Sequence, residues 1–416
     1  MDKFVINGGN QLAGNVEISG SKNAVLPLMT AALLVDGQTS INRVPDLKDT
    51  RTMIKLLKII GAKVSFEANS MKINASNINN LEAPYDLVKT MRASFYVLGP
   101  LLARFGEVRV SLPGGCAWGP RPVDFHLKGL EKLGAKISLE NGYILAKAKH
   151  LYGNKVYFDF PSVGATGNIL MASVLAKGET LIENAAKEPE IVQLCEVLND
   201  MGANINGIGS DKIIVDGVDK LNPVNINVIP DRIEAGTYLI AGAVKGDITL
   251  NYCNPKNLID VLDKLELAGA DISSTENSIS IKKIDSIIPI DVTTEVYPGF
   301  PTDLQAQWMA FMSVAKGKSN IIDTVYHDRF THIPELNRLG ADIRLKDNKA
   351  VINGVSQLIG AQVMSTDIRA SAALILAAII AEGKTEISRV YHIDRGYDSI
   401  EKKFQGLGAD IVRVNV

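Results

Sequence analysis

The chain has 416 residues, of which 46% are hydrophobic, and its 44 Lys and Arg against 46 Asp and Glu give a formal net charge of −2. This composition is typical of a globular protein and excludes an intrinsically disordered chain, and the balance of charge gives no global basic field that would attract nucleic acid. The length exceeds one ordinary hydrophobic core and favours two domains of roughly 200 residues each.

No targeting or membrane segment is predicted. The first residues lack the basic segment followed by an apolar stretch that a secretory signal requires. The longest apolar run, 372–381, is shorter than the ~20 residues that span a bilayer, and it predicts a buried helix. The three cysteines include no CxxC pair and the five histidines no HExxH motif, which argues against a disulfide framework or a zinc site. We therefore expect a cytoplasmic protein that needs no metal or other cofactor and has no nucleic-acid or membrane partner.

Taken in chain order, the sequence repeats one unit six times. An apolar residue followed by Gly-Ala recurs at intervals of 67 to 73 residues, with its glycines at Gly61, Gly134, Gly202, Gly269, Gly340 and Gly408. Each of these glycines follows a helical pattern and precedes an alternating strand, so it suits a helix C-terminus with positive φ. A second glycine begins another alternating strand earlier in each copy, at Gly37, Gly106, Gly178, Gly246, Gly317 and Gly383. The pattern predicts a strand–helix–strand–helix–strand–strand repeat, three per domain, with the domain seam near 225–231.

Unusual residues stand at the predicted helix starts. Fourteen residues before each strand-leading glycine are Asn23, Arg92, Gly164, Arg232, Asp303 and Arg369. Thirteen residues before each Gly-Ala, at the predicted start of the second helix, are Lys48, Arg121, Pro189, Lys256, His327 and Arg395. Arginine at a helix N-terminus opposes the helix dipole, and repeated violations of a local rule suggest a functional site. Two domain ends of this kind, facing each other, would form an anion-binding cleft. The alternative for any single arginine is an ordinary surface ion pair.

A loop rich in glycine and proline surrounds Cys116. Residues 112–124 contain three glycines and three prolines, which predicts a mobile lid between a strand and a helix. Arg121 lies five residues from Cys116, and a nearby cation lowers a thiol pKa, so Cys116 is a candidate acid or nucleophile. Cys195 and Cys253 follow apolar patterns and are interpreted as core residues.

Five segments together resemble a known family. They are Ser19-Gly-Ser-Lys22-Asn23, the loop Pro113-Gly-Gly-Cys116-Ala-Trp-Gly-Pro-Arg121-Pro-Val-Asp124, Phe300-Pro-Thr-Asp303, Asp367-Ile-Arg369 and Asp394-Arg395-Gly-Tyr. They closely resemble the UDP-N-acetylglucosamine 1-carboxyvinyltransferases, which are enolpyruvyl transferases. The resemblance implies an α/β fold, a two-domain inside-out α/β barrel built from six βαβαββ repeats, with its active site in the interdomain cleft. The implied domains are 21–229, with the lid loop around 112–122, and 1–20 plus 230–416.

The resemblance also implies the reaction and the site. The enolpyruvyl group of phosphoenolpyruvate passes to the 3′-hydroxyl of UDP-N-acetylglucosamine by addition and elimination, phosphate is released, and this is the first committed step of peptidoglycan synthesis. The implied catalytic residues are Cys116 as proton donor and site of a phosphoenolpyruvate thioketal adduct, Asp303 as general base, Lys22 and Arg395. The implied phosphoenolpyruvate contacts are Lys22, Asn23, Arg121, Arg329, Arg369 and Arg395. The implied sugar-nucleotide contacts are Asn23, Arg92, Arg121, Pro122, Val123, Asp124, Phe125, Ser162, Val163, Gly164, Asp303 and Val325. Because position 116 is cysteine, sensitivity to alkylation by fosfomycin is also implied.

Two other functions remain as alternatives. A 3-phosphoshikimate 1-carboxyvinyltransferase shares the repeats and the arginine-rich cleft but lacks the cysteine loop and the Arg121-Pro-Val-Asp string. A non-catalytic repeat scaffold that binds anions would have no reason to keep Lys22, Cys116 and Asp303 together. The sequence leaves the oligomeric state open.

Overall fold

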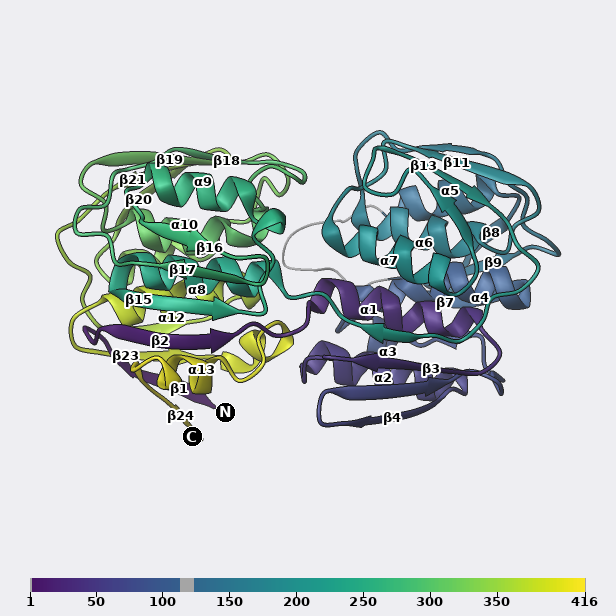
Figure 1. Cartoon of the computed structure of the whole chain (residues 1–416), viewed down its shortest axis with the longest axis horizontal. Helices are drawn as coiled ribbons and strands as arrows, with labels where there is room; N and C mark the ends of the chain where they lie inside the picture. Colours follow the sequence, from purple (N-terminus) through teal and green to yellow (C-terminus); the bar gives the residue numbers. More distant parts are fainter. Residues whose placement is uncertain (1, 113–122, 416) are drawn as a thin grey trace. The chain divides into compact units, whose positions relative to one another are not determined.

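The computed structural model describes residues 2–112 and 123–415. The chain divides into two compact units, a first unit of residues 20–229 and a second unit of residues 1–19 with 230–416. Each unit contains three repeats, and each repeat forms one four-stranded sheet (Figure 1).

The first unit contains repeats one to three. Repeat one comprises β14 (Asn225–Asn227), α1 (Lys22–Ala31), η1 (Ala32–Leu34), β3 (Gln38–Asn42), α2 (Lys48–Ile60), β4 (Lys63–Glu67) and β5 (Ser70–Asn74). Repeat two comprises β6 (Glu82–Ala83), α3 (Tyr85–Val88), η2 (Arg92–Val97), α4 (Leu98–Phe105), β7 (Glu107–Ser111), α5 (Asp124–Lys132), β8 (Lys136–Glu140) and β9 (Tyr143–Lys147). Repeat three comprises β10 (Lys155–Tyr157), α6 (Val163–Ser173), β11 (Glu179–Glu183), α7 (Pro189–Asp200), β12 (Asn204–Asn206) and β13 (Lys212–Asp216).

The second unit contains repeats four to six. Repeat four comprises β2 (Leu12–Glu17), α8 (Arg232–Lys245), β15 (Gly246–Asn251), η3 (Pro255–Asn257), α9 (Ile259–Leu267), β16 (Ile272–Ser274) and β17 (Ser278–Ile281). Repeat five comprises β18 (Val292–Thr294), η4 (Thr302–Leu304), α10 (Gln305–Met312), β19 (Lys318–Asp323), α11 (Ile333–Arg338), β20 (Asp342–Lys346) and β21 (Lys349–Asn353). Repeat six comprises β22 (Gln362–Met364), α12 (Ile368–Ile380), β23 (Lys384–Ser388), η5 (Val390–Arg395), α13 (Ile400–Gly406), β24 (Asp410–Val414) and β1 (Lys3–Asn7).

All six sheets share one topology. The first strand of each repeat pairs parallel with the second, and the fourth strand lies antiparallel between the second and the third. Distant segments complete three of the sheets: β14 supplies the first strand of repeat one, β2 the first strand of repeat four, and β1 the fourth strand of repeat six. The sequence-predicted order of elements within the repeat is therefore confirmed.

Burial explains why the helices lie inside and the sheets outside. Along α6, every residue from Ala165 to Ser173 is buried, and along α12 every residue from Arg369 to Ile379 is buried. A helix that is apolar on all sides must be surrounded by protein, whereas strands such as β5 bury only alternate residues. The sequence prediction that 372–381 forms a buried helix is correct, because α12 covers all but the last of these residues. The result in each unit is an inside-out α/β barrel.

The repeated glycines take the predicted backbone conformation. At the six Gly-Ala phrases φ lies between 91° and 110°, in the left-handed region that closes a helix. The predicted starts of the second helices were wrong in repeats four to six. There α9, α11 and α13 begin at Ile259, Ile333 and Ile400. Lys256 and Arg395 lie in the preceding 3₁₀ helices η3 and η5, and His327 lies in a turn.

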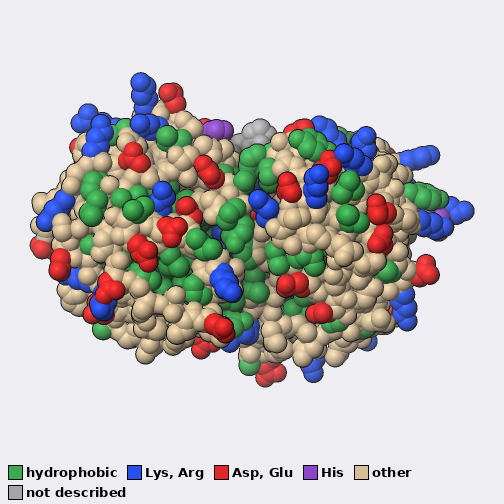
Figure 2. Space-filling model, turned by 45° about the horizontal axis from the view of Figure 1, so that its top comes forward, with side chains coloured by type: hydrophobic (Ala, Val, Ile, Leu, Met, Phe, Trp, Pro, Cys, Tyr) green, Lys and Arg blue, Asp and Glu red, His purple; other side chains and the backbone are tan. Residues whose placement is uncertain are grey.

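Charged groups of both signs are interspersed on the visible face (Figure 2). Over the described ranges 2–112 and 123–415, none of the helices combines the length and apolar character needed to cross a membrane.

Candidate active site

In every repeat the unusual residue stands in the first turn of a helix between the first and second strands, as predicted, although in repeat two the short α3 precedes that helix. Arg92 and Arg232 are the first residues of η2 and α8, and the other four stand second in their helices: Asn23 in α1, Gly164 in α6, Asp303 in η4 and Arg369 in α12. The backbone N–H groups of a first turn lack partners within their helix, so these positions bring polar side chains to sites that already favour anions.

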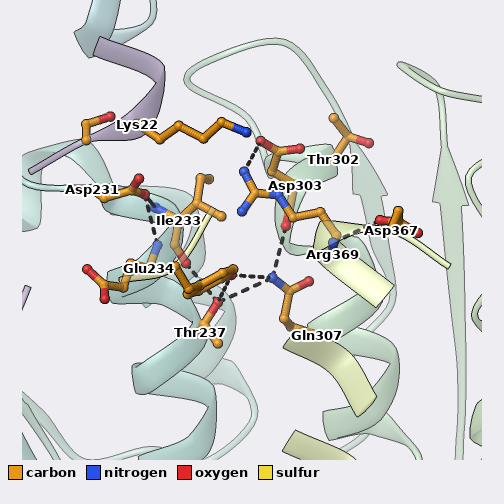
Figure 3. Close-up of polar contacts among 12 residues, drawn as sticks. Lys22, Asp231, Ile233, Glu234, Thr237, Thr302, Asp303, Gln307, Asp367 and Arg369 are labelled. Carbon is orange, nitrogen blue, oxygen red and sulfur yellow. Dashed lines mark hydrogen bonds and ion pairs between the residues drawn. The ribbon is translucent and has the colours of Figure 1, made fainter. Parts of the chain in front are cut away.

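In the second unit, three predicted site residues are in direct contact. Asp303 Oδ1 lies 2.8 Å from Arg329 Nη1. Asp303 Oδ2 lies 2.7 Å from Arg369 Nη2 (Figure 3). The Arg329 and Arg369 side chains are only 12% and 8% exposed, so solvent screens these pairs weakly. Burial acts to raise the pKa of Asp303, but the charges of Arg369 and Arg329 outweigh it and hold that pKa well below its usual range.

Arg369 is held at the N-terminus of α12 despite the opposing helix dipole. The Asp367 carboxylate caps the helix by accepting from the backbone N–H groups of Arg369, at 2.8 Å, and Ala370, at 3.2 Å. This negative charge offsets the cost of placing a cation at a helix start. The Arg369 guanidinium also lies 5.9 Å from the centre of the Tyr397 ring, a cation–π distance.

The buried Gln307 side chain contacts the backbone of Asp303 and two neighbouring hydroxyl groups. Gln307 Nε2 donates to the backbone oxygen of Asp303 at 3.1 Å and lies 3.3 Å from Thr237 Oγ1 (Figure 3). It also lies 3.3 Å from Tyr397 Oη. The Thr237 and Tyr397 hydroxyls are themselves 2.8 Å apart. Helices α8 and α10 and the segment after η5 are thus linked directly beneath the carboxylate.

In the first unit, Lys22 is held by a carboxylate that was not predicted. Lys22 Nζ lies 2.7 Å from Asp49 Oδ2, and the two side chains are 12% and 5% exposed. Ser21 caps α1 by accepting from Ala24 N, and Asp49 stands in the first turn of α2. The pair therefore joins two helix starts of repeat one.

The buried His126 side chain lies close to further residues that were predicted for the site. The pKa of His126 falls to about 3, because burial and then the charge of Arg92 disfavour its protonated form. His126 Nδ1 lies 2.8 Å from Asn168 Nδ2, so the neutral ring accepts there. A Cβ atom at Gly164 would come within 3.2 Å of the ring, so a larger residue there would crowd His126. Ser162 caps α6 by accepting from Ala165 N, and Tyr96 Oη lies 3.5 Å from the Val163 oxygen.

The predicted residues after the loop begin α5. Val123 is its N-cap residue, Asp124 pairs with Lys128 at 3.5 Å, and the Phe125 ring lies 6.2 Å from that of Phe158. Phe125 borders an open groove of about 600 Å³ between α5 and the segment that contains Tyr157. Cys116, Arg121 and Pro122, predicted as site residues, lie outside the described residues.

The remaining predicted residues lie after β19, at the end of η5 and in α1. Val325 follows β19 and donates its backbone N–H to Asp323 at 3.0 Å. Arg395 is the last residue of η5, and its neighbour Asp394 accepts from both terminal nitrogens of Arg413, at 2.6 and 3.1 Å. Asn23 lies in α1, half-buried.

Cys195 and Cys253 are buried, as predicted for core residues, and burial raises the pKa of each thiol to about 12. Within the part of the chain that the structure describes, no three His, Cys, Asp or Glu side chains are grouped to hold a metal ion.

The fold, with arginines and a carboxylate on the first turns of its internal helices, is that of the enolpyruvyl transferases. The enolpyruvyl transferase NikO from Streptomyces tendae superposes with a TM-score of 0.90 at 24% identity, covering 100% of this chain and 99% of that one. EPSP synthase from Acinetobacter baumannii superposes with a TM-score of 0.79 at 17% identity, and both chains are covered completely.

Sequence comparison defines the family. The profile of the EPSP synthase (3-phosphoshikimate 1-carboxyvinyltransferase) family matches residues 6–404, and the chain belongs to this family. A UDP-N-acetylglucosamine 1-carboxyvinyltransferase from Chloroherpeton thalassium is 56% identical, over 99% of this chain and 97% of the relative. The enzyme of the same name from Desulfosudis oleivorans is 53% identical, with both chains covered completely.

Proposed function

We propose that the protein transfers the enolpyruvyl group of phosphoenolpyruvate to the 3′-hydroxyl of UDP-N-acetylglucosamine, with release of phosphate, as the first committed step of peptidoglycan synthesis. The observation that carries this proposal is the full-length identity of 53–56% to enzymes named for this activity. The Asp303–Arg329–Arg369 cluster supports it, because the reaction needs both anion recognition and a base near the accepting hydroxyl.

Arg329 and Arg369 are suited to an anionic substrate. Each guanidinium has five N–H donors, and the contacts with Asp303 use one of them on each side chain. The remaining donors can bind a carboxylate or phosphate of phosphoenolpyruvate in the bidentate geometry that arginine favours. The incoming anion would then compete with Asp303 for the same two cations.

This competition gives Asp303 its role as a base. In the ligand-free protein its low pKa keeps it ionised but makes it a weak base. An anion bound to the other donors of Arg329 and Arg369 adds negative charge beside Asp303 and weakens its attraction to the two guanidiniums, and both effects raise a carboxyl pKa. Asp303 therefore gains basicity when the donor substrate is in place.

The reaction balances as two steps. In the addition, the sugar hydroxyl oxygen bonds to C2 of phosphoenolpyruvate, its proton passes to Asp303, and C3 takes a proton from the acid at position 116. In the elimination, C3 returns a proton to the deprotonated acid at position 116, the C2–O bond to phosphate breaks, and the departing phosphate takes the bonding electrons and the proton held by Asp303. The resemblance assigns the acid to Cys116, which also makes this thiol the proposed target of fosfomycin.

The residues of the first unit are proposed to act on the same substrates. Lys22 is a candidate phosphate ligand whose ammonium group is held by Asp49. Ser162, Val163 and Gly164 begin α6, where backbone N–H groups favour the anionic diphosphate of the sugar nucleotide.

A phosphate-release assay tests the function. The purified protein is mixed with phosphoenolpyruvate and either UDP-N-acetylglucosamine or shikimate 3-phosphate, and inorganic phosphate is measured over time. We expect release only with UDP-N-acetylglucosamine. Release only with shikimate 3-phosphate would support the alternative transferase, and no release with either would support a non-catalytic scaffold.

A further inference from the structure

Asp323, at the end of β19, is a completely buried carboxylate that the proposed reaction does not use directly. Its Oδ1 accepts from Thr294 Oγ1 at 2.7 Å, Val325 N at 3.0 Å and Tyr326 N at 2.8 Å. Its Oδ2 accepts from Thr302 Oγ1 at 2.7 Å. Burying a carboxylate is costly unless it is well hydrogen-bonded, and here four neutral donors from three segments converge on one group.

The hydrogen bond between Thr302 and Asp323 determines how the Thr302 hydroxyl can interact with Arg329. An ionised carboxylate only accepts hydrogen bonds, so the Thr302 hydroxyl must donate its proton to Asp323. The lone pairs of that hydroxyl are then left to accept, and Arg329 Nη1 lies 3.3 Å from Thr302 Oγ1. Arg329 is therefore held between the Thr302 hydroxyl and the Asp303 carboxylate.

The same carboxylate also closes the turn that leads to Arg329. Its bonds to the N–H groups of Val325 and Tyr326 fix residues 324–326 immediately after β19. Thr302, on the other side, immediately precedes Asp303 in η4 (Figure 3). One buried group thus contacts both chain segments that carry the Asp303–Arg329 pair.

We propose that Asp323 is a positioning residue for the proposed transferase reaction, acting through Thr302 to align Arg329 with Asp303. This inference rests on the proposed function, because its consequence is a correctly placed base. A purely structural anchor would be equally sensitive to the loss of any of its hydroxyl donors, whereas a positioning residue depends on the particular donor that faces Arg329.

Two threonines provide a matched test of that difference. Thr302→Val and Thr294→Val each remove one 2.7 Å hydroxyl bond to the same carboxylate. Thr294 is completely buried and its hydroxyl also accepts from Thr324 N at 3.2 Å, so its loss should disturb packing at least as much. Of these two threonine hydroxyls, only that of Thr302 contacts Arg329.

The experiment compares steady-state kinetics of both variants, of Thr302→Ser and of the unaltered protein, with phosphoenolpyruvate and UDP-N-acetylglucosamine. We expect Thr302→Val to lower kcat about 10- to 100-fold, because small misplacements of a catalytic group are costly. In Thr302→Val we expect KM for the sugar nucleotide to change by less than about threefold. We expect kcat of Thr294→Val to stay within about threefold of the unaltered value. Thr302→Ser should keep most of the unaltered rate, because serine keeps the hydroxyl group. Equal losses in the two valine variants, or a change in KM alone, would overturn the proposal.

Crystal structures of the two valine variants give a readout that does not depend on activity. We expect the Asp303–Arg329 contact to lengthen or break in Thr302→Val and to persist at 2.8 Å in Thr294→Val. An unchanged contact in both variants would refute the positioning role, even if the unaltered protein were active. If the unaltered protein releases no phosphate, the proposed function fails, and these structures alone decide whether Asp323 aligns the pair.

Discussion

Replacement of Asp303 by asparagine separates a base from a binding group. The substitution keeps the size of the side chain but removes its charge and its ability to take a proton. General-base catalysis contributes ~10²- to 10⁴-fold, so we predict that kcat falls by that factor. Arg329 and Arg369 lose a negative neighbour 2.8 and 2.7 Å away, so the site becomes more positive and KM for phosphoenolpyruvate should stay the same or fall.

The same variant should be less stable. Asparagine can accept from only one of the two guanidiniums and turns its amide donor toward the other. Breaking a buried ion pair costs about 3–5 kcal/mol, and we expect a loss of that order in the free energy of unfolding, measured with urea.

Asp285→Asn, which changes an exposed carboxylate of the same unit, controls for net charge and should leave rate and stability nearly unchanged. Initial rates at several concentrations of each substrate provide the test. A raised KM for phosphoenolpyruvate with an intact kcat would refute the role of Asp303 as a base.

Three further predictions concern buried groups and the loop cysteine. Burial lowers the pKa of His126 to about 3 and that of His332 to about 4 in the native protein. The unfolded chain therefore binds more protons than the native protein below about pH 6.5. As the pH falls from about 6.5 toward these native pKa values, the free energy of unfolding should decrease by about 1.4 kcal/mol per pH unit for each histidine. His126→Asn should remove one such contribution from urea unfolding measured between pH 5 and 7, and an unchanged slope would contradict the burial of a neutral ring. Lys403→Met removes the 2.7 Å partner of Glu234, whose pKa burial already raises; we expect a loss of about 3–5 kcal/mol that is larger at pH 8 than at pH 5, and a pH-independent loss would argue against an unpaired carboxylate. Cys116→Ser should nearly abolish turnover without changing the unfolding midpoint and should abolish the mass increase caused by fosfomycin, whereas near-normal turnover would exclude the thiol as the acid.

Local backbone requirements made the repeat readable from the sequence. Gly61 and its five counterparts take positive φ, which few other residues adopt, so their spacing revealed six copies of one unit. The first-turn residues were likewise found from a fixed local spacing, and Arg92, Asp303 and Arg369 stand where the sequence predicted them. The two-domain inside-out barrel of βαβαββ repeats was correct as a fold class.

The error at His327 arose where a side chain at the end of a strand fixes the turn that follows. The turn after β19 is closed by Asp323, which bonds to the N–H groups of Val325 and Tyr326, so α11 starts only at Ile333 and not near His327. No short sequence pattern distinguishes such a carboxylate from any polar residue at the end of a strand.

The partners of predicted residues were also missed. Asp49 holds Lys22 although it lies 27 positions later, and a pairing over that separation needs the folded structure. A signal was nevertheless present, because Asp49 directly follows Lys48, one of the marked second-helix starts. Tyr397 was likewise quoted within a motif, but its position beneath Arg369 depends on how η5 packs against α12.

The most direct test measures the carboxyl pKa of Asp303 with and without phosphoenolpyruvate. Carbon-13 NMR of protein labelled at the aspartate carboxyl carbons reports this titration, and the spectrum of Asp303→Asn identifies the signal. We predict a pKa well below the usual range in the free protein and a rise when phosphoenolpyruvate saturates Arg329 and Arg369. A pKa that remains low, or falls further, would contradict the claim that substrate binding turns this carboxylate into the base.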